Sequence, residues 1–254
     1  MCDQFNISIV SYTKDTSDLH MCLDSLKNQH VMKNVIIVDN LGSLAIKTLS
    51  SKYEFVQYFQ LPNVGFGAGH NFASSKFSQG GYRVFLNPDI CLPDQCLNII
   101  KNCFKKNSGV SLLSPILLNL DGSYQQFVRD YPGLPSMLKR IFFNKNSQPD
   151  YTLKDKMFVD TKYMHGAFFV IDKGISTHQS MFDERYFLYL EDIDLCISMA
   201  DYGRVGVCLD AKVFHRHGKA SRKLSRITWI HFISFVKFWL KHGILYRRIK
   251  SNDR

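Results

Sequence analysis

Two acidic motifs in this chain have the residue types needed for chemistry on a phosphate-bearing substrate. Asn87-Pro88-Asp89 follows the apolar run 82–86, and Glu191-Asp192-Ile193-Asp194 follows the aromatic run 187–190. A carboxylate such as Asp89 can hold a divalent cation that bridges phosphate oxygens. Crowded carboxylates at the start of a helix can include a general base. Both motifs also have a structural interpretation, because Asn, Pro and Asp form turns and acidic residues favour helix N-termini.

Two further motifs contain glycine and histidine. The stretch 63–71 (NVGFGAGHN) has three alternate glycines, which permit close approach of a ligand, and the helix after it could bind an anion at its N-terminus. It does not match G-x-G-x-x-G, and a tight turn between a strand and a helix also explains it. The stretch 215–218 (HRHG) could complete a metal site or contact a diphosphate, although isolated histidines are more often structural.

Alternating strands and helices are expected to position these motifs. Apolar runs predict strands over 7–11, 35–38, 55–59, 82–86, 110–118 and 167–171, and helical spacing or turn residues predict helices over 18–29, 43–52, 67–77, 93–106 and 192–202. Such alternation predicts an α/β fold whose central sheet is mostly parallel. Polar residues follow three strands at 12–13, 39–40 and 87–89. Because ligands bind outside the carboxyl ends of parallel strands, we expect these residues to line one cleft.

Composition excludes several classes of protein. With 254 residues, 45% hydrophobic and 13% aromatic, the chain can bury a large core, so intrinsic disorder and collagen-like repeats are excluded. The seven cysteines form no C-x-x-C pair, and an odd number favours reduced thiols over a secreted disulfide framework. The N-terminus has no signal-peptide pattern and no apolar run is long enough to span a bilayer, which predicts a cytoplasmic protein. From residue 125 to about 160 the alternation of strands and helices fails, which suggests irregular structure.

In this order, the motifs resemble those of family 2 glycosyltransferases of the GT-A fold, especially bacterial rhamnosyltransferase-like enzymes of O-antigen and other surface polysaccharides. The resemblance rests on IVSYT (9–13), VDN (38–40), NVGFGAGHN (63–71), FLNPD (85–89), HGAFFVI (165–171), FDERYFLYLEDIDLC (182–196) and HRHG (215–218). It implies a GT-A domain over residues 1–218. Within that domain, residues 1–120 would bind the nucleotide sugar, and residues 121–218 would form the acceptor and catalytic half.

The resemblance also implies roles for individual residues at the matching positions. Asp192 matches the catalytic base of the family, with Glu191 beside it. Asp89 would hold Mg²⁺ or Mn²⁺, and His217 would be an additional metal or diphosphate contact. The nucleotide-sugar donor would be contacted by Tyr12, Asp39, Asn63, Gly65, Gly67, Asn71 and Asn87. The chain departs from many relatives at Ile197-Ser198-Met199, where they carry an arginine, and at Gly218-Lys219-Ala220, where a glycine-rich stretch is shortened.

The implied reaction is a single displacement with inversion at the anomeric carbon. A carboxylate takes the proton of the acceptor hydroxyl, and a divalent cation neutralises the charge that develops on the leaving nucleoside diphosphate. One base on the face opposite the leaving group gives inversion, as in inverting glycosidases. The resemblance implies a sugar donor, with rhamnose as one candidate sugar, and a lipid-linked saccharide as acceptor.

The C-terminal segment 219–254 is basic and amphipathic. Residues 219–250 contain nine Lys or Arg and no Asp or Glu, so this segment accounts for most of the net charge of +10. One helical face would carry Trp229, Phe232, Ile233, Val236, Trp239 and Leu240. A basic helix with such a face predicts peripheral contact with anionic lipid at the inner face of the cell membrane. Docking on the protein's own core, or on a second subunit in a homodimer, is the alternative interpretation.

Two functions from other classes remain open at this stage. A protein of the same fold could bind a nucleotide sugar, or act as a scaffold, without turnover, but the intact Asp89 and Asp192 weigh against this. A nucleic-acid-binding protein could read phosphates through 219–250. Because the positive charge is confined to that segment rather than spread over the chain, we expect no nucleic-acid partner.

Overall fold

The computed structural model describes residues 3–78, 80–128, 131–133, 156–175, 180–216 and 226–243. The strands are β1 (Phe5–Ser11), β2 (Lys33–Asp39), β3 (Val56–Gln60), β4 (Tyr82–Leu86), β5 (Ile90–Cys91), β6 (Val110–Leu118), β7 (Phe158–Asp160), β8 (Phe168–Ile171) and β9 (Arg204–His215). The helices are α1 (Ser17–Lys27), α2 (Leu44–Ser50), α3 (Phe66–Lys76), α4 (Cys96–Lys106), α6 (Glu191–Met199) and α7 (Arg226–His242). Across these ranges the strands form one nine-stranded sheet in the order β3-β2-β1-β4-β8-β6-β9-β5, with β7 paired to β9.

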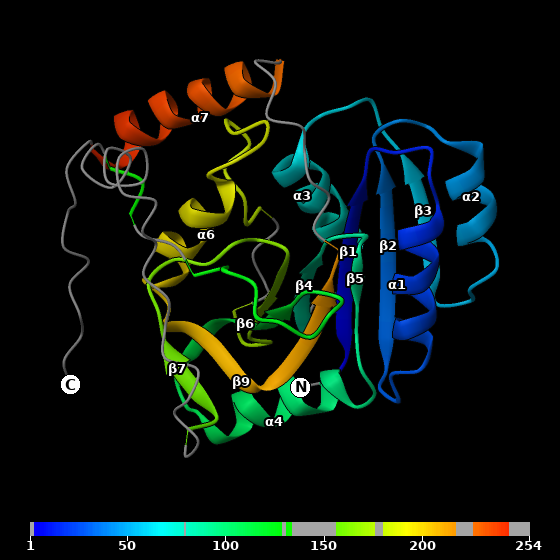
Figure 1. The fold of residues 1–254 in the computed structure, drawn as a ribbon, viewed down its shortest axis with the longest axis horizontal. Coiled ribbons are helices and arrows are strands. Elements are labelled where there is room, and N and C mark those ends of the chain that lie inside the picture. The colour runs from blue at the N-terminus through cyan, green and yellow to red at the C-terminus, as the bar shows by residue number, and fades with distance from the viewer. Residues whose placement is uncertain are drawn as a thin grey trace.

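The first half of the sheet is parallel, as predicted. β1 lies between β2 and β4, and Ile9 is in register with Ile37 of β2 and Leu86 of β4. Alternate side chains of these strands point to opposite faces. Ile9 and Ile37 belong to the core cluster that includes the buried side of α1, whereas Val10 packs in a second cluster with Ala73 of α3. Helices therefore cover both faces, with α1 and α2 on one side and α3 on the other (Figure 1).

The second half of the sheet is mixed, so the expected parallel character holds only in part. β8 runs antiparallel between β4 and β6, and β9 runs parallel to β6 but antiparallel to β5 and β7. β9 was not predicted, because Gly206, Asp210 and Lys212 interrupt its apolar pattern. A Cβ at Gly206 would overlap the Val159 carbonyl oxygen, so glycine is what allows β7 to lie against β9.

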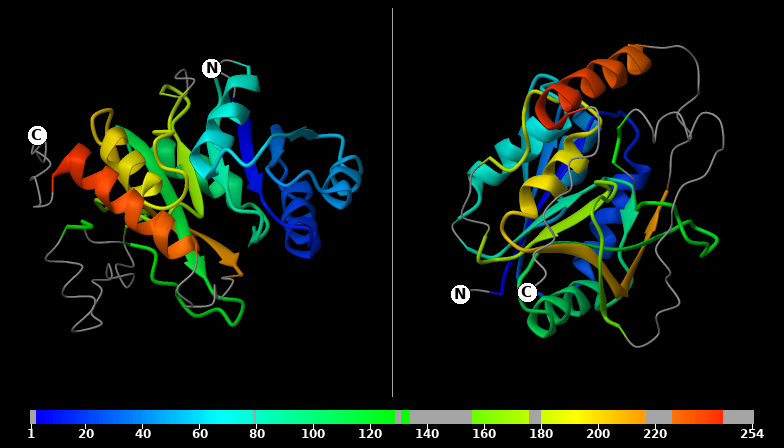
Figure 2. Two further views of the ribbon diagram at one scale, coloured as in Figure 1. Left: turned by 90° about the horizontal axis from the view of Figure 1, so that it is seen from above. Right: turned by 90° about the vertical axis from the view of Figure 1, so that its left-hand side faces the viewer.

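Helix α7 covers α6 and the segment before it (Figures 1 and 2). Phe238, which lies off the predicted apolar face, is completely buried against the core. The Trp239 indole donates to the Pro132 carbonyl at 2.8 Å, and the Ser234 hydroxyl donates to the Leu188 carbonyl at 2.8 Å. The helix therefore docks through Phe238 and polar contacts. Most of the predicted apolar face is left exposed, namely Trp229, Phe232, Ile233, Val236 and Leu240.

Candidate active site

The loop before β8 joins the two acidic motifs. The Gly166 N–H donates to Asp192 Oδ2 at 3.1 Å, and the Asn87 N–H donates to the Ala167 carbonyl oxygen at 2.9 Å. A Cβ at Gly166 would lie 2.9 Å from the Asp192 Cβ, so this close approach requires glycine. The end of β4 and the start of α6 are therefore held by adjacent residues of one loop, although they are about a hundred positions apart in the sequence.

Asp89 faces a histidine at the end of β9. The antiparallel pairing of Ile90 with His215 brings the Asp89 Oδ1 to 3.4 Å from the His215 Nε2. This oxygen is buried and accepts no hydrogen bond from the residues that the structure describes. The His215 ring also lies 6.2 Å, centroid to centroid, from the ring of His165, which precedes Gly166. The Asp89 side of the site thus adjoins the loop that holds Asp192.

The hydrogen bonds of Gln125 place a proton on His215 Nδ1. The Gln125 amide nitrogen donates to the His215 carbonyl at 2.7 Å and to Asn119 Oδ1 at 2.9 Å, so the Gln125 amide oxygen faces His215 Nδ1 at 2.8 Å. An amide oxygen can only accept, and Nδ1 therefore carries the proton. In the neutral ring, the Nε2 lone pair then points toward Asp89, an arrangement that is common for histidines that bind metals.

The pair of Asp89 and His215 fits a divalent cation. Carboxylate oxygen and neutral imidazole nitrogen are both ligands of Mn²⁺, and carboxylate suits Mg²⁺. Within the described residues, no group of three or more His, Cys, Asp or Glu side chains is arranged to hold a metal ion. The remaining ligands would therefore come from substrate and water, as is usual for magnesium sites on phosphates.

The predicted metal ligand His217 lies outside the described residues, and the histidine that faces Asp89 is His215, which the sequence did not single out. The HRHG stretch contains both histidines at equivalent spacing, and nothing in the sequence distinguishes them. The distinguishing signal is strand register, since His215 pairs with Ile90, the residue after Asp89. That register follows from the antiparallel pairing of β5 with β9, which was itself not predicted.

Asp192 stands in the first turn of α6, where two backbone N–H groups bind its carboxylate. Its Oδ1 accepts the Ile193 N–H at 2.8 Å, while its Oδ2 accepts the Gly166 N–H. The turn into α6 uses left-handed backbone at two residues with side chains, Tyr189 (φ 72°) and Leu190 (φ 69°). Each such residue costs on the order of 1–3 kcal/mol, and such strain occurs where surrounding contacts impose it. Asp192 remains partly accessible to solvent.

Glu191 differs from its neighbour because it is buried. Its Oε2 has no hydrogen-bond partner in the described part of the chain. Burial, together with the nearby carboxylates of Asp192 and Asp194, raises the pKa of Glu191 well above its ordinary value. Glu191 therefore favours its neutral form more than an exposed glutamate does, whereas Asp192 is partly accessible to solvent.

Glu191→Gln is expected to make stability less sensitive to high pH. A carboxyl whose pKa is raised on folding stabilises the folded state at low pH, and this contribution is lost as the pH rises above the unfolded pKa toward the folded one. The loss has a slope of at most about 1.4 kcal/mol per pH unit. Glutamine cannot ionise, so the melting temperature of the variant should exceed that of the wild type increasingly as the pH rises above about 5. Parallel melting curves across that range would contradict the assignment.

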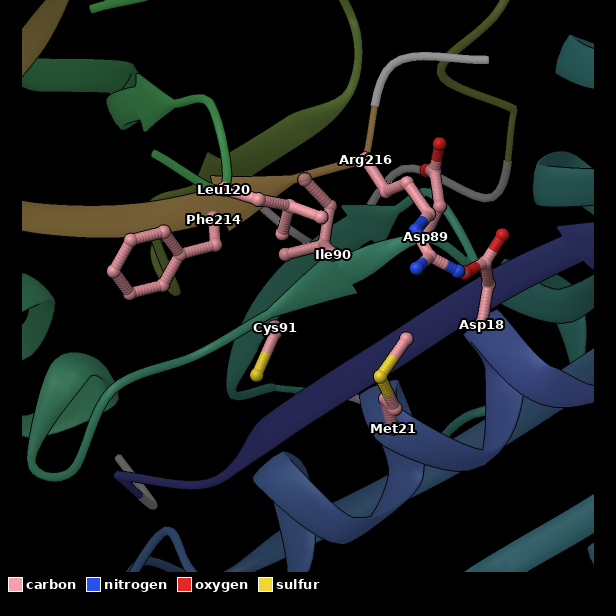
Figure 3. A pocket seen from close by; sticks show the side chains of 8 residues that line it. All are labelled: Asp18, Met21, Asp89, Ile90, Cys91, Leu120, Phe214 and Arg216. Atoms are coloured by element: carbon pink, nitrogen blue, oxygen red, sulfur yellow. The ribbon is translucent and has the colours of Figure 1, made fainter. Parts of the chain in front are cut away.

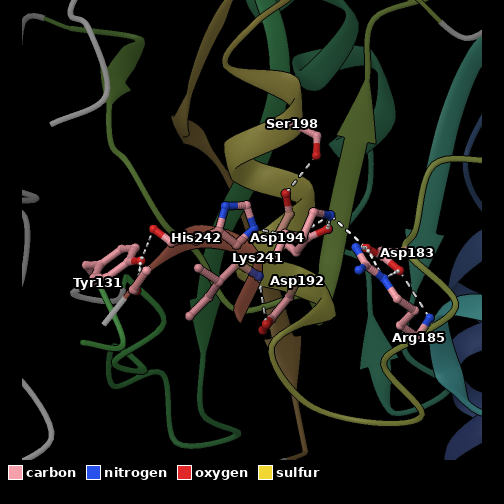
Figure 4. A network of polar contacts seen from close by, with 10 residues as sticks. Tyr131, Asp183, Arg185, Asp192, Asp194, Ser198, Lys241 and His242 are labelled. Carbon is pink, nitrogen blue, oxygen red and sulfur yellow. Dashed lines mark hydrogen bonds and ion pairs between the residues drawn. The ribbon is translucent and has the colours of Figure 1, made fainter. Parts of the chain in front are cut away.

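Asp194 anchors α7 to α6. Its carboxylate is buried and lies 2.8 Å from Lys241 Nζ and 2.5 Å from His242 Nε2, and Lys241 also contacts Asp183 at 2.7 Å (Figure 4). Charges buried in this way are tolerated because they are paired. The third carboxylate of the acidic motif thus has a structural role, and the C-terminal end of α7 is tied to the helix that carries Asp192.

Tyr12 and Asp39, two of the predicted contacts to the nucleotide-sugar donor, differ in their exposure to solvent. Tyr12 follows β1 and has 62% of its surface exposed, so its ring is open to a stacking partner. Asp39 is completely buried. Its carboxylate accepts N–H groups from Leu41, Gly42 and Ser43 and the Tyr58 hydroxyl, at 2.6–3.0 Å. In this conformation the Asp39 carboxylate stabilises the turn that follows β2. Because four hydrogen bonds already occupy its two oxygens, contact with a nucleotide base would require that turn to open.

The glycines of 63–71 bring protein segments together. A Cβ at Gly65 (φ 98°) would overlap the Phe187 carbonyl, and one at Gly67 would lie 2.8 Å from the Phe182 Cβ. The exposed Asn63 uses its side-chain oxygen to accept the Gly65 N–H at 3.3 Å. The close neighbour that Gly65 and Gly67 permit in this structure is therefore the segment before α6, and contact of these glycines with the donor stays a prediction.

Asn71 binds the same segment. Its amide nitrogen donates to the Phe182 carbonyl at 2.8 Å and to Glu184 Oε1 at 2.9 Å, and its oxygen accepts the N–H groups of Met181 and Phe182 at 3.0 Å. These four bonds use the full capacity of the amide. The geometry thus favours a structural role for Asn71 over contact with the donor.

A cavity of about 260 Å³ opens beside Asp89 (Figure 3). It is lined by Asp18, Met21, Asp89, Ile90, Cys91, Leu120, Phe214 and Arg216. The cavity therefore lies between the N-terminal part of α1 and the paired strands β5 and β9. Asn87 and Asp192 do not line it and belong to the adjoining region around the loop 165–167.

Comparisons with known proteins agree with this architecture. No model of a protein family matches the sequence. The sequence is similar to that of the rhamnosyltransferase WbbL of Escherichia coli, with 27% identity over 187 residues, which are 70% of each chain.

Solved structures share the fold at low sequence identity. TarS of S. aureus, in complex with UDP-GlcNAc, matches with a TM-score of 0.59 and 15% identity over 87% of this chain and 62% of that one. The mannosyltransferase PcManGT of Pyrobaculum calidifontis, in complex with GDP-Man and Mn²⁺, matches with a TM-score of 0.59 and 13% identity over 86% and 58%. This chain thus spans less than two thirds of both solved proteins.

The architecture is that of the GT-A glycosyltransferases. Together with the similarity to the rhamnosyltransferase, it supports a family 2 glycosyltransferase, and the family resemblance of the sequence motifs is confirmed.

Proposed function

We propose that this protein is an inverting glycosyltransferase that moves a sugar from a nucleoside-diphosphate donor to a hydroxyl of a saccharide acceptor. The observation that carries the proposal is the shared loop 165–167, which binds the Asp192 carboxylate at Gly166 and the backbone after β4 at Ala167. This loop brings a proton acceptor and the Asp89 region to one edge of the sheet. The similarity to a rhamnosyltransferase makes a rhamnose donor the first candidate.

In this proposal each carboxylate has a separate task. Asp192, held by two backbone N–H groups, accepts the proton of the acceptor hydroxyl as its oxygen attacks the anomeric carbon. Asp89 and His215 would hold a Mg²⁺ or Mn²⁺ ion, which stabilises negative charge on the leaving diphosphate when bound. Tyr12 and Asn87 are the proposed contacts to the rest of the donor, through a ring open to solvent and an amide beside the catalytic loop.

A donor screen tests the proposal. Purified protein is incubated with dTDP-rhamnose, UDP-galactose, UDP-N-acetylglucosamine and GDP-mannose in MgCl₂ or MnCl₂, with and without a polyprenyl-diphosphate-linked saccharide. Release of nucleoside diphosphate is then measured. We expect release from one donor, increased by the acceptor and dependent on the cation. Donor binding without release would instead identify a nucleotide-sugar-binding protein.

We also propose that the lipid-linked acceptor is met at the membrane, through α7. Within the described residues, no helix is long and apolar enough to cross a bilayer. The exposed side of α7 carries a groove of about 590 Å³ lined by Trp229, Ile230, Phe232, Ile233, Val236 and Lys237. Trp229 and Leu240 are 67% and 84% exposed. An exposed apolar helix face with aromatic residues, in a segment whose sequence is rich in Lys and Arg, is typical of helices that lie in the membrane interface.

Vesicle binding is expected to depend on this face. Because burying each large apolar side chain contributes about 1.5–3 kcal/mol, the variant Trp229→Ser/Leu240→Ser should bind vesicles containing anionic phosphatidylglycerol at least about 10²-fold less tightly. Co-sedimentation measures the affinity. Leu44→Ser, which changes an exposed leucine on α2, is the matched control and should bind like the wild type. A dimer that dissociates in the double variant, without loss of vesicle binding, would place a second copy on this face instead.

A further inference from the structure

An ion pair between distant elements lies at the cavity beside Asp89. Arg216 Nη1 donates to Asp18 Oδ1 at 2.9 Å, which joins the end of β9 to the first turn of α1. The Arg216 and Asp18 side chains are 50% and 36% exposed. An exposed ion pair of this kind contributes only about 0–1 kcal/mol, so Arg216 can exchange Asp18 for another anion at little cost.

The backbone places Arg216 next to the proposed metal ligand. Its N–H donates to the Asp89 carbonyl oxygen at 3.1 Å, and it directly follows His215. Figure 3 shows the Arg216 side chain beside those of Asp89 and Asp18. Among the eight residues that line this cavity, Arg216 carries the only positive charge, while Asp18 and Asp89 are both acidic.

A diphosphate bound in this cavity would add negative charge next to the carboxylates of Asp18 and Asp89, so positively charged groups must neutralise it. A diphosphate held by a cation on Asp89 would arrive beside two carboxylates, of which only Asp89 can be neutralised by that cation. A guanidinium presents paired N–H donors whose geometry matches phosphate oxygens, and such charge-assisted bonds are stronger than those between neutral groups. Arg216 is the lining residue that can provide them.

We propose that Arg216 binds the diphosphate of the donor and that Asp18 holds Arg216 until the donor arrives. The inference rests on the proposed function, because it requires a diphosphate at Asp89. Donor binding exchanges the Arg216–Asp18 ion pair for contact between Arg216 and the diphosphate. Asp18 therefore competes with the donor diphosphate for the Arg216 guanidinium, and this competition lowers the affinity for the donor.

Calorimetric titration tests this exchange. Wild type, Arg216→Gln, Asp18→Asn and the double variant are titrated with UDP, dTDP and GDP in MnCl₂, and with the corresponding nucleosides. For the diphosphate that the wild type binds, Arg216→Gln should weaken binding about tenfold or more. Asp18→Asn should strengthen it up to about fivefold, but should change nothing in the Arg216→Gln background. Nucleoside binding should be equal in all four proteins.

Arg204→Gln is the matched control. Arg204 stands at the opposite end of β9 and forms an exposed ion pair with Asp160 at 2.6 Å. This variant should bind the diphosphate like the wild type. Unchanged binding in Arg216→Gln, or an equal gain from Asp18→Asn with and without Arg216, would overturn the exchange alone. A wild type that binds none of the three diphosphates would overturn the proposed function as well.

Discussion

Replacing Asp192 with asparagine is expected to lower the rate of sugar transfer by about 10²–10⁴-fold, the usual contribution of a general base. Asparagine has nearly the same shape and keeps an oxygen that can accept the N–H of Ile193 or Gly166. It cannot accept the proton of the acceptor hydroxyl. Turnover is measured with the donor that the screen identifies, and donor affinity by calorimetry. The affinity should change little, because the proposed base contacts the acceptor.

Glu191→Gln is the matched control for this variant. Both substitutions remove one carboxylate from adjacent positions of α6, but Glu191 is buried and has a raised pKa. It should therefore retain most of the wild-type turnover at neutral pH. Near-normal turnover in Asp192→Asn, or equal losses in both variants, would show that the base has been assigned to the wrong residue.

Replacing Asp89 with asparagine is expected to remove the dependence of turnover on Mg²⁺ or Mn²⁺ and to lower kcat/KM by about 10²-fold or more. A bound cation stabilises developing charge on the leaving group by several kcal/mol, and a neutral amide is a poor ligand for it. His215 alone would then face the site. The measurement is the rate at increasing MnCl₂ concentration, together with the shift in melting temperature that MnCl₂ causes.

Asp160→Asn provides the comparison for Asp89→Asn. Asp160, the last residue of β7, is an exposed carboxylate paired with Arg204, and Arg204 stands at the opposite end of β9 from His215. This variant should keep the cation dependence of the wild type. If Asp89→Asn responds to MnCl₂ as the wild type does, the cation is held elsewhere, and the pairing of Asp89 with His215 has another purpose.

The parallel half of the sheet could be predicted from local pattern. A run such as 35–38, which is continuously apolar, fits a strand that is buried on both faces, and its neighbours alternate with helical spacings. The same strands end at the polar residues 39–40 and 87–89, so their gathering at one edge followed from the parallel arrangement. These predictions needed only information within about thirty residues.

The features that were missed depend on contacts between distant segments. Glycine-rich spacing indicates close approach but not what approaches, and here Gly65 and Gly67 meet residues about 120 positions away. The register of β9 against β5, which places His215 beside Asp89, is likewise set by pairing that no local pattern encodes. The periodicity of α7 identified its apolar face correctly. That this face points outward follows from the polar contacts of Ser234, Lys241 and His242 on the other side.

The tie between Asp194 and the end of α7 has a geometric consequence. Asp194 is two residues from Asp192 on the same helix. Lys241 and His242 of α7 both bind the Asp194 carboxylate. A bilayer bound to the outer face of α7 would thus fix the height of Asp192 above the lipid. Such an enzyme would select its acceptors by length. It would favour glycans whose reactive hydroxyl lies at the same distance from the bilayer as Asp192, over longer or shorter ones.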